Sequence, residues 1–384
     1  MDINTEEMKK TLLEKTEGIR KVLDSKPAVK GLLGKKLLVA LVAGIAVSCN
    51  GNPSSYLRIE GTVVMGISDP EKVPAHVKIP EGITEIEEDA FTVRVGREYK
   101  GNKAVKTLSL PKSLKKIGDG AFLNCTYLES VEIPNGVTEI DANTFMGCTS
   151  LKTVTIGNGV TKIGKYAFEG CTSLASVSIG NGVTEIGEEA FKNCTSLASV
   201  NIPDGVTKIG GKAFEGCTSL ASVKIPDGVT YIVTETFKNC TSLASVNIPD
   251  GVTGIGYNAF DGCTSLKSVT IPGSVEEIYR SAFGGCTSLA SVEISEGVKK
   301  IGQSAFQDCT SLASVVIPSS VTSIWAYAFH KCPKLKDVRY GGTVKQLRNP
   351  SLLFVDWDFH AFGVDVFDAD NGVVIHCADG DVAL

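Results

Sequence analysis

Residue types that carry catalytic chemistry are scarce in this 384-residue chain. It has four histidines and two tryptophans, and no Gly-x-Ser-x-Gly or Gly-Lys-Ser/Thr motif accompanies them. The cysteines form no Cys-x-x-Cys pair, the usual half of a zinc site. The net charge is −5 without a basic stripe, which argues against nucleic-acid binding. These absences predict a protein that is not an enzyme, with no metal, no other cofactor and no small-molecule substrate.

Long apolar runs are also missing. The longest is Leu37–Val47, 11 residues preceded by two lysines. This is too short to cross a bilayer as a helix but has the length of a signal-peptide core. It leads into Ala46-Val47-Ser48-Cys49, which resembles a bacterial lipobox, in which the cysteine receives lipid. We therefore expect a signal core and lipobox-like site at 37–49, with Cys49 as the lipid attachment site and a membrane contact through that lipid.

The segment before this run does not fit an ordinary signal peptide. Residues 1–36 carry nine Lys/Arg and six Asp/Glu, so this extension is too long and too charged. Either the native start lies downstream, or the extension is real. Two alternatives to a lipoprotein signal stay open, a buried segment of a cytoplasmic protein and an uncleaved anchor. Residues 50–72 are interpreted as a polar tether and an N-terminal cap.

The most informative feature of the chain is a strict period. Ten cysteines follow one another at intervals of 23 residues, and a phenylalanine three residues before each cysteine keeps the same interval. A fixed period of this length is the signature of a solenoid, in which each repeat packs only against its neighbours. The cysteines are Cys125, Cys148, Cys171, Cys194, Cys217, Cys240, Cys263, Cys286, Cys309 and Cys332.

Each repeat predicts one coil of a spiral. Leu-x-x-Val-x-Ile alternates at its end, which favours a short strand. Asn-Gly or Asp-Gly follows in several copies, as at Asn158-Gly159, and these pairs turn the chain. A second apolar pair, Val-x-x-Ile, leads into an Ala-Phe segment that is too short for more than one helical turn. We expect about eleven such coils over 73–340 and a C-terminal cap at 341–384, because an open end would expose apolar core.

Disulfides do not fit this spacing. Cysteines of one column would have parallel side chains, one coil apart, so their Cβ atoms would not face each other. We interpret the ten cysteines as a structural ladder of free, buried thiols that act as small core residues.

The unit resembles that of the BspA-like leucine-rich repeat family of bacterial surface proteins. The match rests on I-P-x-x-V-T-x-I-G-x-x-A-F-x-x-C-x-S-L, seen from Ile202 through Leu220, and covers about Val77 to Tyr340. The resemblance implies a leucine-rich repeat solenoid. It further implies a cell-surface adhesin or binding scaffold, whose partners in several relatives are host matrix proteins or other cells. Together with the lipobox-like site, this predicts exposure on the outer membrane or cell surface as a lipoprotein. Two alternatives remain: a passive surface-layer or antigenic scaffold, and an intracellular interaction module if Cys49 is not processed.

Departures from the repeat are the candidate binding residues. The outward face of the first strand is a ladder of small hydroxyls without aromatic or arginine anchors. Late in the chain, however, the segment after the second apolar pair acquires aromatic residues at nearly the same phase, which predicts a partner-binding patch on one flank. Its members are Tyr257, Tyr279, Trp325 and Tyr327. An eight-residue insertion at roughly Thr92 to Tyr99 is the other irregularity, and inserted loops often carry binding.

Overall fold

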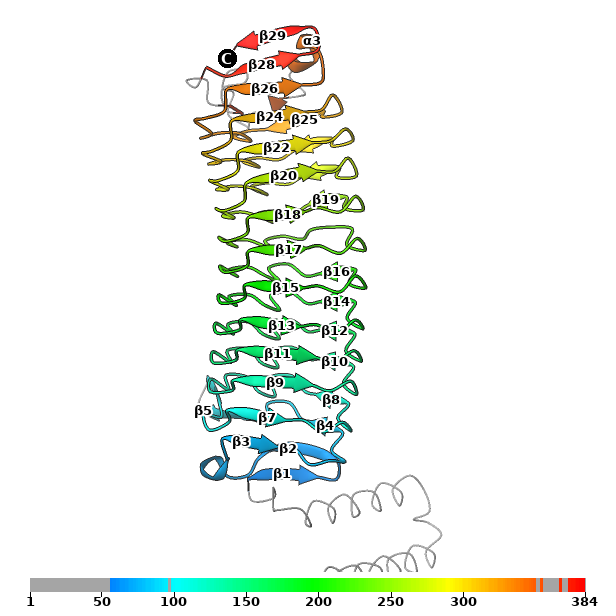
Figure 1. Cartoon of the computed structure of the whole chain (residues 1–384), viewed down its shortest axis with the longest axis vertical. Coiled ribbons are helices and arrows are strands. Elements are labelled where there is room, and N and C mark those ends of the chain that lie inside the picture. The colour runs from blue at the N-terminus through cyan, green and yellow to red at the C-terminus, as the bar shows by residue number, and fades with distance from the viewer. Residues whose placement is uncertain (1–55, 96–97, 350–352, 355–365, 368–371, 384) are drawn as a thin grey trace, which may run out of the picture.

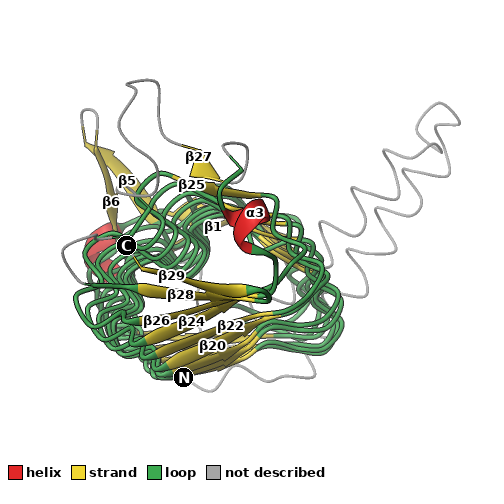
Figure 2. Cartoon of the chain, turned by 90° about the horizontal axis from the view of Figure 1, so that it is seen from above, coloured by secondary structure: helices red, strands yellow, loops and turns green. Residues whose placement is uncertain are grey.

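The chain forms a single long spiral of stacked coils (Figure 1). The computed structural model describes residues 56–95, 98–349, 353–354, 366–367 and 372–383. Seen along its axis, the spiral has strands β20, β22, β24, β26 and β28 on one side and β25 and β27 on the opposite side (Figure 2). The predicted solenoid with a 23-residue period is therefore confirmed.

The first ladder contains twelve parallel coil strands, most of them built on the Val-x-Ile segment of a repeat. Strand pairing runs from β3 to β18 and again from β20 onward, and no described strand pair joins β18 to β20. Partners are offset by one period, as in Val131↔Val154, so the strands present a central apolar residue, usually valine, inward and its polar neighbours outward. The strands are β3 (His76–Lys78), β7 (Thr107–Ser109), β9 (Ser130–Ile133), β11 (Thr153–Ile156), β13 (Ser176–Ser178), β15 (Ser199–Asn201), β17 (Ser222–Lys224), β18 (Ser245–Asn247), β20 (Ser268–Ile271), β22 (Ser291–Ile294), β24 (Ser314–Ile317) and β26 (Asp337–Tyr340).

The second ladder faces the first and is built on the isoleucine that follows the turn. Its strands are short because the chain turns away directly after this residue, in many coils at a glycine such as Gly164 or Gly187. They are β4 (Glu85–Ile86), β8 (Lys116–Ile117), β10 (Glu139–Ile140), β12 (Lys162–Ile163), β14 (Glu185–Ile186), β16 (Lys208–Ile209), β19 (Gly254–Ile255), β21 (Glu277–Ile278), β23 (Lys300–Ile301), β25 (Ser323–Trp325) and β27 (Leu353–Phe354).

The second ladder is interrupted at one coil. Ile232 pairs only forward, with Ile255, and no described backbone hydrogen bond joins 230–233 to 207–210. In this coil Val233 replaces the usual glycine, and a Cβ at the equivalent Gly210 would lie 2.4 Å from the amide of Glu188 in the preceding coil. A β-branched side chain at this close approach therefore separates the two coils.

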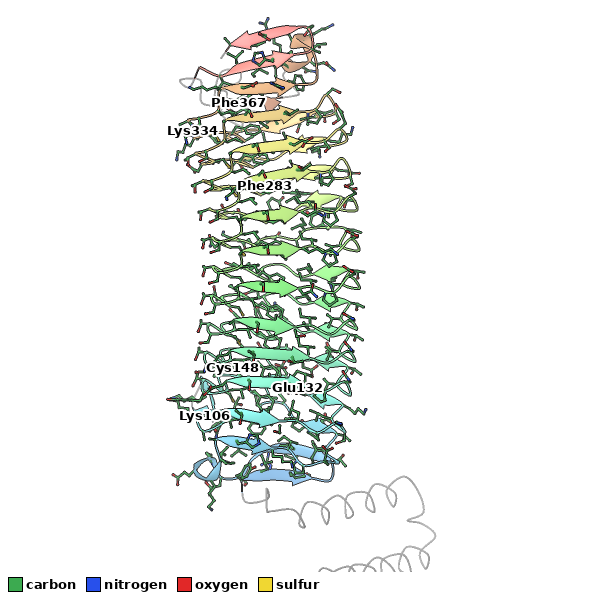
Figure 3. All side chains as sticks on the ribbon, viewed as in Figure 1. Lys106, Glu132, Cys148, Phe283, Lys334 and Phe367 are labelled. Carbon is green, nitrogen blue, oxygen red and sulfur yellow. The ribbon has the colours of Figure 1, made fainter. Side chains whose placement is uncertain are left out.

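Stacked rings fill the core between the ladders. Eleven consecutive phenylalanines from Phe91 to Phe329 and then Phe367 have ring centroids 4.7–5.6 Å apart, with planes mostly within 11° of parallel. All are buried. Figure 3 shows Phe283 and Cys148 inside the spiral, whereas Lys106 and Lys334 project from its flank. Each coil therefore depends on its neighbours for the burial of its largest side chain.

Tight turns, and not helices, lead from the second ladder back to the first. One column of turn residues has φ between 53° and 63°, including Asn143, Tyr166 and Tyr327. A second column precedes the cysteines, as at Asn124 and Gly147. Two left-handed residues per coil reverse the chain without a helical turn.

The ends depart from the coil pattern. The first described elements are β1 (Leu57–Glu60) and β2 (Val63–Ile67), which form an antiparallel hairpin because Gly61 turns at φ 64°. A 3₁₀ turn, η3 (Pro70–Lys72), follows. The insertion is a second hairpin, β5 (Thr92–Val95) with β6 (Glu98–Gly101).

At the other end the coils give way to a short helix and two further strands. Helix α3 (Val344–Leu347) starts at a capping box on Thr343. Strand β28 (Val374–Cys377) continues the first ladder, and β29 (Gly380–Ala383) pairs with it antiparallel. Strand β29 is the last strand that the structure describes. The cap at 341–384 stays a prediction, since much of it lies outside the described residues.

Candidate functional site

Exposed aromatic rings mark the strongest departure from the repeat. Tyr231 and Tyr279 occupy the two outward positions of the second ladder, and Trp325 stands in the same column as Tyr279, two coils further on. Tyr257 and Tyr327 follow in the adjoining turns. We call these five residues the aromatic patch. Four of them are 37–49% exposed and Tyr279 is half-buried, an exposure typical of rings at interaction surfaces.

Three of the rings form a cluster. The centroids of Tyr257 and Tyr279 are 5.1 Å apart with planes tilted by 56°. Those of Tyr231 and Tyr279 are 6.2 Å apart and nearly edge-to-face, a favoured arrangement for aromatic pairs. The ring of Tyr231 lies over Gly254, where a Cβ would meet it at 2.5 Å. Burial, together with Tyr279, raises the pKa of Tyr231, so its hydroxyl stays protonated and able to donate.

Trp325 and Tyr327 form a second group. Trp325 Nε1 donates to Ser323 Oγ at 3.1 Å, and the Tyr327 ring meets that of His330 edge-on at 5.4 Å. The four residues singled out from the sequence therefore lie along one flank but in two groups, with the coil that contains Gly302 between them. Sequence reasoning missed Tyr231. This residue interrupts a column, formed by the residue before the isoleucine of each second-ladder strand, in which glutamate and lysine alternate.

The charged residues in the column of Tyr231 explain why the aromatic patch differs from the rest of its flank. Salt bridges link members of this column in pairs at 2.8–3.6 Å, as in Lys116–Glu85, Lys162–Glu139, Lys208–Glu185 and Lys300–Glu277. These pairs are exposed, so each stabilises the fold little, but together they leave the flank electrically balanced. The alternation fails at Tyr231 and Gly254, and again at Ser323 in the last of these coils. The flank therefore changes there from paired charges to uncharged rings.

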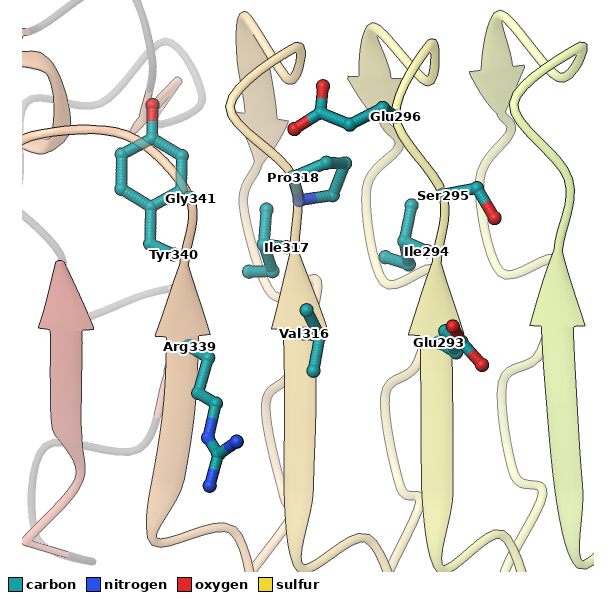
Figure 4. A pocket seen from close by; sticks show the side chains of 10 residues that line it. All are labelled: Glu293, Ile294, Ser295, Glu296, Val316, Ile317, Pro318, Arg339, Tyr340 and Gly341. Atoms are coloured by element: carbon teal, nitrogen blue, oxygen red, sulfur yellow. The ribbon is translucent and has the colours of Figure 1, made fainter. Parts of the chain in front are cut away.

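The first-ladder face is the other exposed surface. Its outward residues are small and polar over most of its length, and Asn135 Oδ1 accepts from the amide of Asn158 beside a shallow depression of about 430 Å³. Its C-terminal end differs: Val316, 44% exposed, lies between Glu293 and Arg339 on neighbouring strands in a depression of about 460 Å³ (Figure 4). Both depressions are open and shallow, unlike the enclosed pockets that bind small molecules.

Comparison with known proteins settles the family. The model of the BspA type leucine-rich repeat region, which spans six copies, matches residues 74–161, 94–221 and 207–336, well over half of the chain. This chain belongs to the BspA-type leucine-rich repeat family. No curated protein sequence matches it.

Several solved structures are similar to this BspA-type chain. A leucine-rich repeat protein from Bacteroides ovatus is 25% identical with a TM-score of 0.50, over 76% of this chain and 94% of that one. A leucine-rich cell surface protein from Faecalibacterium prausnitzii is 28% identical with a TM-score of 0.42, over 77% and 96% of the two chains. The pneumococcal vaccine antigen PcpA is 17% identical with a TM-score of 0.47, over 85% and 95%.

The cysteine ladder of this BspA-type solenoid lies inside the spiral. All ten thiols are buried and free. From Cys148 onward each Sγ donates to the carbonyl of the phenylalanine in the preceding coil at 3.1–3.3 Å, as in Cys217 to Phe191. Burial raises the pKa of Cys217 to about 12. The thiols therefore carry a structural hydrogen bond that column spacing alone does not predict.

Other predicted features give no reactive site among the residues that the structure describes. His76 Nδ1 lies 2.6 Å from Thr107 Oγ1, and His376 pairs with Asp381 at 2.9 Å, both on the surface. The described part contains no cluster of metal-ligating side chains. Within it, no helix is long and apolar enough to span a membrane. Cys49 and the Leu37–Val47 run lie outside the described residues.

Proposed function

We propose that this chain is a cell-surface binding protein of adhesin type, whose aromatic patch contacts a protein on host matrix or on another cell. The observation that carries the proposal is the replacement of balanced charges by exposed rings at one place on a regular solenoid. Tyrosine and tryptophan dominate the energetics of protein interfaces because they bury a large area at low entropic cost.

Anchoring completes the proposal. Lipid on Cys49 would hold the solenoid at a membrane by burying acyl CH₂ groups, at about 0.8 kcal/mol each. The solenoid would then be displayed at the membrane surface with the flank that carries the aromatic patch open to partners.

A passive scaffold is the second candidate. The paired charges of the second ladder and the hydroxyls of the first ladder are what a solvated, non-binding repeat surface would present. This function predicts no ligand and no effect of patch substitutions on attachment.

The test compares binding of the purified chain to immobilised matrix proteins and to whole cells. We expect the double variant Tyr257→Ala/Trp325→Ala to lose at least about tenfold in affinity, since truncating an anchor ring at an interface costs on the order of 2 kcal/mol. Tyr127→Ala is the matched control, because Tyr127 is 49% exposed but lies far from the patch. Equal binding by the double variant, with unchanged circular dichroism, contradicts the role of the patch.

A further inference from the structure

At the position of Tyr279, successive coils alternate between a residue with a side chain and a glycine. This column reads Val233, Gly256, Tyr279, Gly302 and Trp325 from coil to coil. Gly302 has no side chain, and its backbone packs closely on the preceding coil, since a Cβ there would lie 2.7 Å from the carbonyl oxygen of Ile278. Tyr279 and Trp325 therefore stand as two ridges with a low coil between them.

The axial distance between the two backbone positions that carry these rings follows from the stacking. Core ring centroids advance 5.3 Å from Phe283 to Phe306 and 5.2 Å from Phe306 to Phe329. Two coils thus separate positions in one column by about 10 Å along the axis. A polyproline II helix repeats every three residues, or about 9.3 Å. A β-strand repeats one face every 6.8 Å or so, so it would not bring equivalent residues onto both ridges.

An α-helix is the other regular segment with a matching repeat, about 10.5 Å for seven residues. A helix, however, binds through a continuous stripe that includes its i+3 and i+4 residues. The i+3 and i+4 residues of a bound helix would meet the coil of Gly302, where Lys300 is exposed and Gln303 and Ser304 are half-buried. A polyproline II helix turns its intervening residues away from the surface and leaves only every third residue in contact.

The polar groups and the charge around the ridges suit the same ligand. The carbonyls of a polyproline II helix have no internal partners and accept bonds from outside. The turns beside the ridges carry exposed Tyr257 and Arg280, which supply donors. The nearest charged pair of the column, Lys300 with Glu277, is already matched at 3.6 Å, so this pair adds no net charge to the site.

We propose that Tyr279 and Trp325 form a docking site for a polyproline II segment of the partner protein, with residues three apart on the two rings. This deepens the function proposed above and rests on it, since it names the kind of segment that the aromatic patch would take.

The test uses a fluorescein-labelled oligoproline, with a glycine–serine peptide and a helical Glu-Ala-Ala-Ala-Lys repeat peptide of equal length as comparisons. By fluorescence anisotropy we expect saturable binding of the oligoproline alone. Trp325→Ala should weaken it at least about tenfold, and Tyr279→Ala similarly, while Tyr127→Ala should stay within about twofold of the unaltered chain. Circular dichroism checks that each variant folds.

Three outcomes overturn the inference: no saturable binding of the oligoproline, equal binding of the comparison peptides, or oligoproline binding that Trp325→Ala leaves unchanged. If the intact chain nevertheless binds matrix proteins or cells through the aromatic patch, the proposed function stands and only the polyproline II ligand is wrong. If oligoproline binds as expected but no surface partner does, the docking chemistry stands and the adhesin function fails.

Discussion

The cysteine is the residue that best separates what the sequence predicts from what it does not. Its period and its distance from the phenylalanine were enough to place it inside a solenoid and to argue against disulfides. The bond from each Sγ to a phenylalanine carbonyl of the preceding coil could not be predicted, because it depends on how far neighbouring coils advance and rotate. Tyr231 was missed for a similar reason: only the folded ladder shows that its column is one of paired charges.

The buried thiols predict a specific weakness at alkaline pH. Burial raises the pKa of Cys125, Cys171, Cys217 and Cys263 to about 12, from an ordinary value of 9.0. Below pH 9 both folded and unfolded thiols are protonated and this stability is fully present. Above it the unfolded thiols ionise first, so each coil loses about 1.4 kcal/mol per pH unit until its folded pKa is reached.

Thermal unfolding by circular dichroism between pH 8 and 11 measures this loss. The triple variant Cys171→Ala/Cys217→Ala/Cys263→Ala is the control. It should be less stable at pH 8, because it loses three buried hydrogen bonds and some packing, but its stability should fall less steeply with pH. Identical pH slopes for the two proteins would falsify the assignment to the thiols.

At the scale of the element, the strands were predictable and their interruption was not. Leu-x-x-Val-x-Ile and the isoleucine after the turn placed both ladders, because a period of two fixes which face is buried. Val233 in place of glycine gave a visible signal, but its effect depends on the close approach of the neighbouring backbone. Tyr279 and Trp325, at the same position, keep the ladder because their Cβ atoms are unbranched.

We therefore expect the second ladder to open first at this coil. The amides of Thr230 and Val233 should exchange with deuterium at least about tenfold faster than those of Thr207 and Gly210, which donate to the preceding coil at 3.0 Å and 2.8 Å. Val233→Gly should remove the separation and slow the exchange of Thr230. Equal protection across 207–233 in the unaltered chain would show that the break does not persist in solution.

At the scale of the whole molecule, stability is a sum over neighbouring coils. Removing one complete period, residues 195–217, joins Cys194 directly to Thr218 and keeps every column in phase. We expect this shortened chain to fold with a melting temperature within a few degrees of the parent, and small-angle scattering should find it shorter by about 5 Å.

A deletion of half a period is the matched control. Removing residues 195–206 would place a turn opposite a strand and bury polar residues, so this chain should not fold cooperatively. If both deletions behave alike, the coils are not independent repeating units.

The most direct test of the proposed surface-binding function is whether the solenoid is displayed outside the cell. The measurement is metabolic labelling with radioactive palmitate in the native host, for the unaltered chain and for Cys49→Ala, together with protease shaving of intact cells. The account predicts label on the unaltered chain alone and cleavage of its repeats from outside. A chain that takes up no label and survives shaving would contradict it, and its partner would then have to be sought in the cytoplasm.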